Sequence, residues 1–270
     1  MGEIVACANQ KGGVGKTTTV VNLASYLADA GQRVLVVDLD SQGNATSGLG
    51  IDRDCLEGSS YDLLMGFQST SALKVPTQVH NLHLLPSGRE LAGVEVELVP
   101  LEGRERRLQR ALQSELDLFD YIFLDCPPSL GLTTVNALTA AHSVLIPIQC
   151  EYYALEGLSQ LMSTIDLIRD NLNPGLRVKG VLLTMYDGRT TLSADVSAQV
   201  RQHLAGQVFD AVVPRSVRLA EAPSYGRPIT IYSPDSRGAQ AYRRLAEEIL
   251  SRAAQAGGTV GPLPVWATAS

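Results

Sequence analysis

The sequence predicts an α/β fold, with a doubly wound, mostly parallel twisted sheet that carries helices on both faces. Apolar runs of strand length alternate with longer amphipathic stretches along the chain, which is the order of elements in a β-α-β protein. The strand-like runs are continuously apolar, as expected of strands that are buried on both sides. Apolar residues make up 45% of the 270 residues, which is enough to form such a core.

The predicted elements follow in chain order. Short continuous apolar runs predict strands over residues 4–9, 33–38, 82–86, 121–125, 143–149 and 178–185. Apolar positions at helical spacing predict helices over residues 16–30, 104–116, 132–141, 154–171, 192–204 and 238–254. Gly31 closes the first helix. No Pro- or Ser-rich linker divides residues 1–254, so we expect one domain there. Residues 255–270 lack periodicity and contain Gly and Pro breaks, which predicts a disordered tail.

Composition narrows the class of protein. The net charge is −6, which taken over the whole chain argues against a nucleic-acid binder. No run approaches the roughly 18 apolar residues of a membrane span, and the start lacks the pattern of a secretory signal. The cysteines form no CxxC pair, so we expect free, mostly buried thiols in a reducing cytoplasm and no zinc site. They are Cys7, Cys55, Cys126 and Cys150.

A glycine-rich segment, KGGVGKTT at 11–18, follows the first predicted strand and opens the first predicted helix. Glycines allow close backbone approach, and the N–H groups of a helix start attract an anion, so this context predicts a phosphate-binding loop. Lys16 would bridge the β- and γ-phosphates, the Thr17 hydroxyl would ligate Mg²⁺, and Thr18 could donate to the α-phosphate. The predicted nucleotide contacts are Lys11, Gly12, Gly13, Val14, Gly15, Lys16, Thr17 and Thr18.

The loop departs from the common pattern G-x-x-x-x-G-K-[ST]. Gln10 stands where the first glycine is expected, and an additional lysine, Lys11, heads the segment. An incidental glycine-rich turn is the alternative interpretation. It is disfavoured because the strand, the GKT triplet and the helix coincide, and because acidic signals follow.

Acidic residues end two of the predicted strands. The run VLVVDLD places Asp38 and Asp40 after the second strand, and YIFLD ends in Asp125. In an open parallel sheet, ligand groups gather at the carboxyl ends of the strands. We therefore predict that Asp40 orients an attacking water, that Asp38 caps the next loop, and that Asp125 holds Mg²⁺ through water, as in a Walker B motif. An ordinary strand-end carboxylate is the alternative for Asp125.

Five separated blocks together resemble one protein family. They are KGGVGKTT at 11–18, VDLDSQGNATSGLG at 37–50, LDCPPSLG at 124–131, PIQCEYYALEGLSQL at 147–161 and VPRSVRLAEAPSYGRPI at 213–229. In this order they resemble the ParA/Soj chromosome-partitioning ATPases, which carry a deviant Walker A loop. The resemblance covers residues 1–252 and implies a P-loop NTPase fold.

The resemblance also implies a function. Members of the family use ATP and Mg²⁺, form a nucleotide sandwich dimer in which the lysine matching Lys11 reaches the partner's phosphates, and bind double-stranded DNA without sequence preference. A ParB-type centromere-binding protein stimulates hydrolysis, which releases the dimer from DNA. Pro214 and Ser216 would lie by the adenine, although related sequences often have Asn at the second position. Arg189 and Arg218 would contact DNA, so a cytoplasmic, nucleoid-associated ATPase is expected.

The charge distribution supports a DNA-binding segment. Residues 213–244 contain six arginines and two acidic residues, a local charge of +4. Arg218 and Arg227 are expected in non-helical sequence, where pairing with neighbouring acids is less available, whereas Arg243 and Arg244 fit a solvated helix face. No aromatic interleaving suggests base stacking here, so we expect contacts with DNA phosphates, which would be independent of base sequence and sensitive to salt.

Two related classes are weighed as alternatives. A MinD-like membrane ATPase would need a basic amphipathic helix near its C-terminus, but no Lys or Arg follows Arg252. A nitrogenase-type iron protein would need two cysteines at a dimer seam, and the four cysteines lie in other contexts. Both alternatives are therefore disfavoured.

Overall fold

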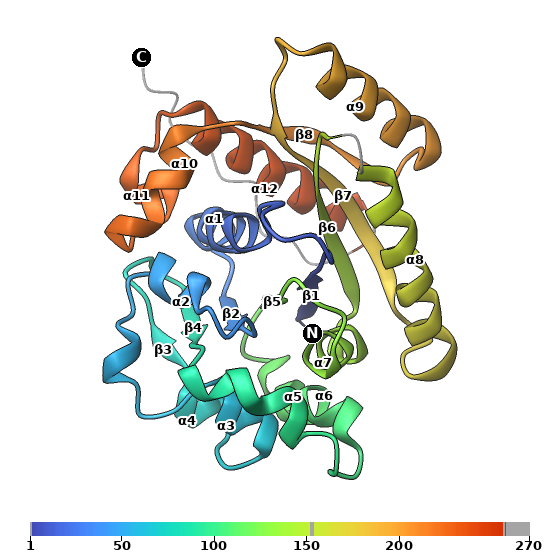
Figure 1. Cartoon of the computed structure of the whole chain (residues 1–270). Helices are drawn as coiled ribbons and strands as arrows, with labels where there is room; N and C mark the ends of the chain where they lie inside the picture. The colour runs from blue at the N-terminus through green and yellow to red at the C-terminus, as the bar shows by residue number, and fades with distance from the viewer. Residues whose placement is uncertain (1, 152–153, 256, 258–270) are drawn as a thin grey trace.

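The structure is a computed structural model that describes residues 2–151, 154–255 and 257. The described strands form one eight-stranded sheet in the order β3-β4-β2-β5-β1-β6-β7-β8. All neighbouring pairs are parallel except β3 and β4, which are antiparallel. Helices cover both faces of the sheet (Figure 1). The predicted fold class is thus confirmed.

The strands match the prediction closely in the centre of the sheet and less well at its edges. Their bounds are β1 (Glu3–Cys7), β2 (Val34–Asp38), β3 (Val75–Pro76), β4 (Leu82–Leu85), β5 (Tyr121–Asp125), β6 (Ser143–Gln149), β7 (Arg177–Tyr186) and β8 (Val208–Pro214). The edge strands β3 and β8 were not predicted. In β8 the side chain of Asp210 is 95% exposed, so this strand lacks the continuous apolar run by which the buried strands were identified.

The long predicted helices are present, and several short ones join them. The helices are α1 (Lys16–Asp29), α2 (Asn44–Gly48), α3 (Ser60–Met65), α4 (Thr70–Leu73), α5 (Val94–Glu97), α6 (Arg107–Leu112), α7 (Leu132–Ala140), α8 (Ala154–Asn171), α9 (Thr191–His203), α10 (Val217–Glu221), α11 (Ile229–Tyr232) and α12 (Arg237–Gln255). The single helix predicted over residues 104–116 is wrong in extent. That segment is α6 flanked by two 3-10 turns, Arg104–Arg106 and Gln113–Glu115.

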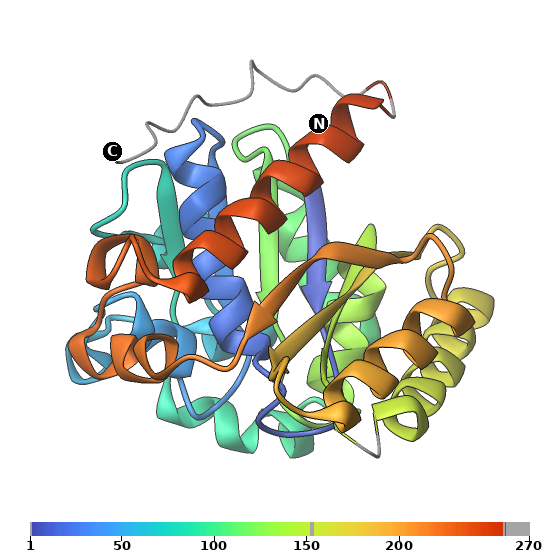
Figure 2. The ribbon, with the colours of Figure 1, turned by 90° about the horizontal axis from the view of Figure 1, so that it is seen from above.

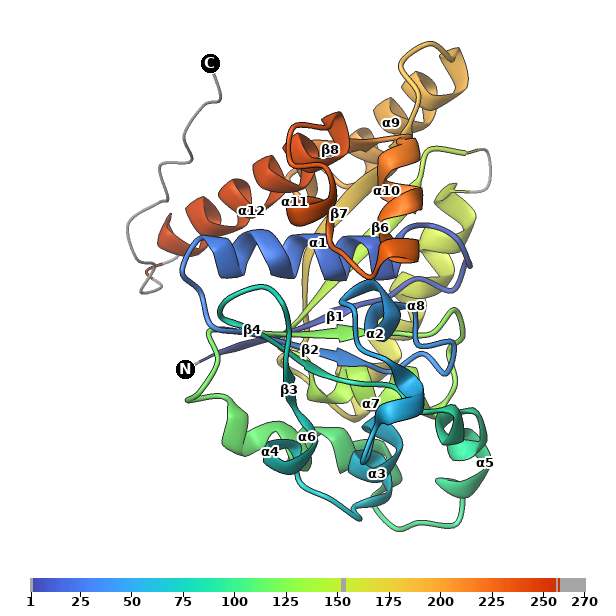
Figure 3. The same ribbon diagram turned by 90° about the vertical axis from the view of Figure 1, so that its left-hand side faces the viewer.

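Two hydrophobic cores lie on the two faces of the sheet. Because side chains alternate along a strand, β1 sends Val5 and Cys7 into one core and Ile4 and Ala6 into the other. The first core lies under α1 and α12, which pack beside each other, as Figures 2 and 3 show. Helices α3–α9 cover the other core. This two-sided burial is what the continuously apolar strands predicted.

The cysteines are free in the structure. Cys7, Cys126 and Cys150 are buried and Cys55 is exposed, which confirms the interpretation as mostly buried thiols. Burial raises the pKa of the Cys150 thiol to about 11, so this side chain stays a neutral part of the core near pH 7. The predicted tail beyond residue 254 lies mostly outside the described residues, and α12 ends at Gln255.

The register of the central strands brings the acidic strand ends together. Asp125 of β5 is level with Cys7 of β1 on one side and with Asp38 of β2 on the other. The backbone N–H of Leu39 donates to the carbonyl oxygen of Asp125 over 3.0 Å. The segment that carries Asp40 therefore leaves the sheet at the same edge as the loop that joins β1 to α1, with the end of β5 between them.

Candidate active site

The glycine-rich loop is fixed by side chains from its own strand end and from β7. The Asn9 side chain donates from Nδ2 to the carbonyl oxygen of Pro147 over 2.8 Å and accepts at Oδ1 from the N–H of Lys11 over 3.0 Å. On the far side, the Thr184 hydroxyl donates to the carbonyl oxygen of Val14 over 2.9 Å. The loop is thus held between the ends of β6 and β7. Sequence reasoning missed Asn9 and Thr184, because nothing in their local sequence marks them.

Two glycines of the loop have backbone conformations that other residues rarely adopt. Gly13 has φ +75° and Gly15 has φ +86°, both in the left-handed region. Gly15 is the N-cap of α1 and supplies no side chain to cap the first turn. The N–H groups at the start of α1 are therefore available to an anion, and the positive end of the helix dipole favours one there.

The two lysines of the loop have different environments. Lys16 is 7% exposed, and its Nζ donates to the carbonyl oxygen of Lys11 over 3.3 Å, so its ammonium group lies against the loop. Lys11 is exposed, and its Nζ forms an ion pair of 2.9 Å with Glu151 just beyond β6. Lys16 is therefore buried against its own loop, whereas Lys11 faces solvent and its ammonium group is held only by a surface ion pair.

Asp125 is the candidate metal-binding carboxylate. It is fully buried, and neither of its carboxylate oxygens has a hydrogen-bond partner among the described residues. Burial, with the negative charge of Asp38 as the next cause, raises the pKa of Asp125 well above the usual range. The Thr17 hydroxyl, which lies near the carboxylate without reaching hydrogen-bond geometry, and the positive charge of Lys16 act in the opposite direction. A buried carboxylate without a partner is costly. A cation, directly or through water, would remove that cost, so the residue fits Mg²⁺.

A protein cage for the metal is absent from the described residues, because no three His, Cys, Asp or Glu side chains there are grouped to hold an ion. This agrees with the way Mg²⁺ is usually bound beside nucleotides, through one or two protein oxygens, waters and the phosphates themselves. Thr17 at the start of α1 and Asp125 at the end of β5 are the residues that could contribute.

Asp38 and Asp40 differ in what they bind. Asp38 is fully buried and accepts three hydrogen bonds: two at Oδ2, from the N–H and hydroxyl of Thr46, and one at Oδ1, from the N–H of Asp40. Burial nevertheless raises the pKa of Asp38 to about 6. Because Thr46 lies in α2, Asp38 caps that helix, and its predicted capping role is confirmed. Asp40 is 8% exposed, and its Oδ1 accepts from the N–H of Gln42 over 3.0 Å.

A cavity of about 200 Å³ adjoins the start of α1. Thr17, Thr18 and Asn22 line it from α1, and Arg227 lines it from the segment before α11. Asn22 donates to the carbonyl oxygen of Thr18 and accepts from the N–H of Ile229, each over 2.7 Å, so it joins α1 to the start of α11. Arg227, assigned to DNA from the sequence, thus stands in the wall of a cavity next to the phosphate loop. Sequence reasoning missed Asn22.

Pro214 and Ser216 lie at the same edge of the sheet as the loop. Pro214 ends β8 level with Tyr186 of β7, and Ser216 is the N-cap of α10. The N–H of Arg215 between them donates to the carbonyl oxygen of Tyr186 over 3.1 Å. Since Thr184, two residues earlier in β7, holds the phosphate loop, this turn lies beside the site.

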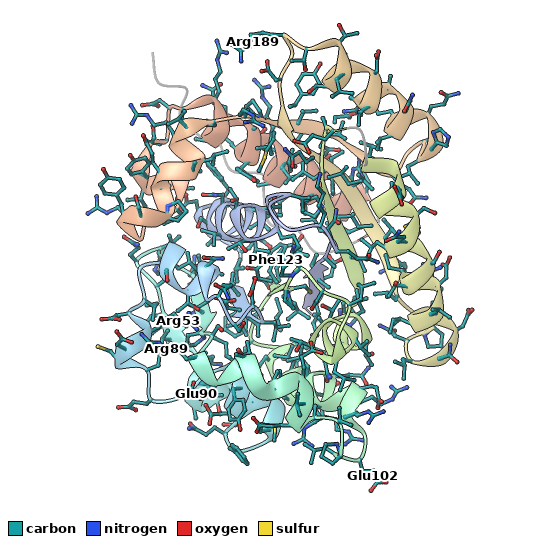
Figure 4. All side chains as sticks on the ribbon, viewed as in Figure 1. Arg53, Arg89, Glu90, Glu102, Phe123 and Arg189 are labelled. Atoms are coloured by element: carbon teal, nitrogen blue, oxygen red, sulfur yellow. The ribbon has the colours of Figure 1, made fainter. Side chains whose placement is uncertain are left out.

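The arginines assigned to DNA are exposed but paired. The prediction that Arg218 lies in non-helical sequence is wrong, because it lies in α10 and pairs with Glu221, three residues on, over 3.0 Å. The Arg189 side chain is 87% exposed and donates two hydrogen bonds to Asp187, and the backbone N–H of Arg189 donates a third. These hydrogen bonds lower the pKa of the Asp187 carboxyl to about 2. Figure 4 shows Arg189 at an extremity of the molecule. Both arginines could exchange these surface partners for phosphates.

A glycine-rich loop between β1 and α1, with acidic strand ends beside it, defines the class of P-loop nucleotide-binding α/β proteins. A family model described as an AAA domain matches residues 2–178. The chain is 55% identical to the sporulation initiation inhibitor protein Soj of Bacillus subtilis, over 92% of this chain and 98% of that protein. It is 53% identical to the chromosome-partitioning ATPase Soj of Thermus thermophilus, over 93% and 97% of the two chains. The chain therefore belongs to the Soj/ParA family of chromosome-partitioning ATPases.

Solved structures agree with the fold and with a nucleotide site. A Mycobacterium smegmatis protein named cobyrinic acid a,c-diamide synthase, solved with bound ADP and magnesium, is 40% identical with a TM-score of 0.83, over 99% of this chain and 100% of that chain. The cell division ATPase MinD of Pyrococcus furiosus is 30% identical with a TM-score of 0.77, over 93% and 100% of the two chains. Among the helices of the described residues, none combines the length and apolarity needed to span a membrane.

Proposed function

We propose that this chain is an ATP-driven partition switch. In this proposal ATP and Mg²⁺ join two copies into a sandwich dimer, the dimer binds double-stranded DNA without sequence preference, and hydrolysis stimulated by a ParB-type centromere-binding protein releases it. Family membership supports this assignment, and so do the residues at the carboxyl edge of the sheet. The protein would then be associated with the nucleoid.

The observation that carries the proposal is the contrast between the two loop lysines. Lys16 is buried against its own loop, whereas Lys11 is exposed and held by a surface ion pair alone. An exposed cation at the head of a phosphate loop is suited to neutralise charge on a nucleotide held by a second subunit. Groups supplied in this way by a partner increase phosphoryl-transfer rates by orders of magnitude.

The chemistry would be divided among this chain's own residues. Lys16 and the loop N–H groups hold the phosphates, and Thr17 with Asp125 holds Mg²⁺, which supplies charge neutralisation at the phosphates. Asp40 orients the attacking water at the end of β2. Pro214 and Ser216 lie beside the base. The cavity at Thr18 and Asn22 extends the site along α1, which favours a ligand larger than phosphate alone.

The experiment that tests this function is analytical ultracentrifugation of the purified protein, with and without ATP and with and without random duplex DNA. We expect a single subunit without ATP, a dimer with ATP and Mg²⁺, and association with DNA only in the ATP state. A protein that remains a single subunit at saturating ATP, or that binds duplex equally well without nucleotide, would contradict the proposal.

Gly12→Val should block dimerisation without destabilising the fold of the single subunit. Gly12 is exposed and its φ is not positive, and an added Cβ would meet only the Pro128 Cβ, at 3.9 Å, an ordinary contact. The folded subunit therefore tolerates the substitution, while a partner loop that approaches here would collide with the branched side chain. We expect at least a tenfold weaker ATP-dependent dimer in size-exclusion runs, with an unchanged melting temperature. If the Gly12→Val variant dimerises normally, the dimer contact does not lie at Gly12.

Arg218→Ala should weaken DNA retention without affecting ATP binding. Its pair with Glu221 is a surface pair, worth at most about 1 kcal/mol, so phosphates can compete for the guanidinium. Two such contacts per dimer would reduce the slope of log affinity against log salt by about 2. Arg243→Ala, which removes the same charge from α12, is the control. If Arg218→Ala and Arg243→Ala both show the salt slope of the unchanged protein, Arg218 does not contact DNA.

The Mycobacterium smegmatis structure is named a diamide synthase, and amide synthesis is a different class of reaction from ATP hydrolysis. It would couple ATP cleavage to a carboxylate substrate, whereas the partition proposal needs only water. Partition is favoured because several of the relatives, including those of Myxococcus xanthus and Thermus thermophilus, carry that function in their names. Phosphate release that proceeds without an added carboxylate substrate and rises with DNA and a ParB-type protein would support partition.

A further inference from the structure

Arg53 binds the loop that carries Asp40. This arginine opens a 3-10 turn, Arg53–Cys55, that follows α2 in the chain. Its Nη2 donates to the carbonyl oxygen of Ser41 and its Nη1 to that of Gln42, each over 2.8 Å. Its Nε donates over 3.0 Å to the carbonyl oxygen of Ser87, which follows β4. One guanidinium group therefore joins two loops at the carboxyl edge of the sheet.

The guanidinium also packs against the backbone of the same loop. Gly43 has φ +66°, and a Cβ added there would lie 2.5 Å from the Arg53 Nε. The side chain thus occupies the space that any larger residue would need at this position. Figure 4 shows Arg53 beside α2, with Arg89 as its neighbour at the surface.

Two of the three residues that Arg53 binds, Gln42 and Ser87, in turn hold Asp40. The N–H of Gln42 donates to Asp40 Oδ1 over 3.0 Å, so Arg53 fixes the residue that orients this carboxylate. The Ser87 hydroxyl donates to the carbonyl oxygen of Asp40 over 2.7 Å, so the second loop holds its backbone. Asp40 is therefore fixed at its side chain and at its main chain by residues whose carbonyl oxygens Arg53 binds.

We propose that Arg53 is a positioning residue for ATP hydrolysis, which acts by holding the Asp40 loop in the geometry that orients water. This inference depends on the proposed role of Asp40. Charged donors form stronger hydrogen bonds than neutral ones, and the planar fork of arginine matches three carbonyl oxygens in a way that the single ammonium group of lysine does not.

The test compares Arg53→Ala, Arg53→Lys and Arg89→Ala in steady-state ATP hydrolysis. Arg89 is the matched control, because it is a neighbouring arginine whose side chain is 78% exposed and pairs with Asp54, without contact to the Asp40 loop. A displacement of about 1 Å in a reacting group lowers rates by about 100-fold. We expect kcat of Arg53→Ala to fall by about that factor with KM for ATP unchanged, Arg53→Lys to recover part of it, and Arg89→Ala to stay within about twofold.

Hydrogen exchange supplies a readout that does not depend on turnover. In Arg53→Ala the amides of residues 42 and 43 should exchange at least about tenfold faster, with the rest of the sheet unchanged. If Arg53→Ala unfolds, Arg53→Lys takes its place in both measurements. Equal kcat and equal exchange in the Arg53 variants and in Arg89→Ala would overturn the inference.

A double variant separates this inference from the proposed function. If Asp40→Ala alone leaves hydrolysis intact, the role of Asp40 is wrong and the positioning role falls with it. If Asp40→Ala stops hydrolysis and Arg53→Ala does not slow it, only the positioning role is wrong. We expect Arg53→Ala to add no further loss when Asp40 is already alanine, because residues that act as one unit are not additive.

Discussion

Asp40→Ala is expected to lower the rate of ATP hydrolysis by about 10²–10⁴, the usual contribution of a group that assists proton transfer or orients a nucleophile. Asp40 follows the end of β2, at the same edge of the sheet as the phosphate loop. In the described part of the chain its carboxylate accepts one hydrogen bond, from Gln42. The substitution removes that group and leaves the loop lysines in place. Nucleotide binding should persist, so the variant should accumulate as an ATP-bound dimer on DNA, measured by phosphate release and DNA retention in parallel.

Asp38→Ala is the control that separates chemistry from folding. Asp38 is fully buried and accepts three hydrogen bonds that hold α2 and the Asp40 loop. Leaving those donors without an acceptor costs about 1–3 kcal/mol each, so Asp38→Ala should lower the melting temperature clearly. Asp40→Ala should change it little. Loss of hydrolysis with equal losses of melting temperature in both variants would mean that Asp40 acts through the fold alone.

The centre of the site could be predicted because the phosphate loop is one continuous segment and because the acidic residues end strands of the same parallel sheet. The loop at 11–18 joins a buried strand to a helix, and the parallel register brings the ends of β2 and β5 level with it. Local patterns and the rule that strand ends gather ligands were sufficient here. The capping role predicted for Asp38 agrees with the two hydrogen bonds that its carboxylate accepts from Thr46 of α2.

The rest of the site depends on contacts between segments far apart in sequence. Asn22 reaches Ile229, and Arg53 reaches Ser87, and neither pair has a local signature. Arg218 was misplaced because the Pro and Gly that follow it end a helix rather than prevent one, so α10 fits within five residues. The edge strand β8 was not predicted because the exposed residue Asp210 interrupts its apolar run.

Lys11→Ala is expected to abolish the ATP-dependent dimer and, with it, retention on DNA. The Lys11 side chain contributes little to the single subunit, because its contact with Glu151 is a surface pair in which both side chains are more than 40% exposed. Such pairs are worth about 0.2–1 kcal/mol. The fold and the buried Lys16 are unaffected, so ATP should still bind. Sedimentation at saturating ATP should therefore show single subunits, with an affinity for the partner at least about 100-fold weaker, the loss expected when a buried charge is left without its opposite.

Glu151→Gln tests whether dimerisation depends on the positive charge of Lys11 or on its ion pair with Glu151. It also breaks the contact with Lys11 but leaves the ammonium group in place, so a protein that needs Lys11 for its partner's phosphates should still dimerise with ATP. If instead both variants lose the dimer equally, the pair itself supports assembly, and the lysine does not act across the interface. If neither loses it, charge neutralisation between subunits comes from another residue. The opposite responses of these two variants would show that a single exposed cation converts nucleotide binding into association.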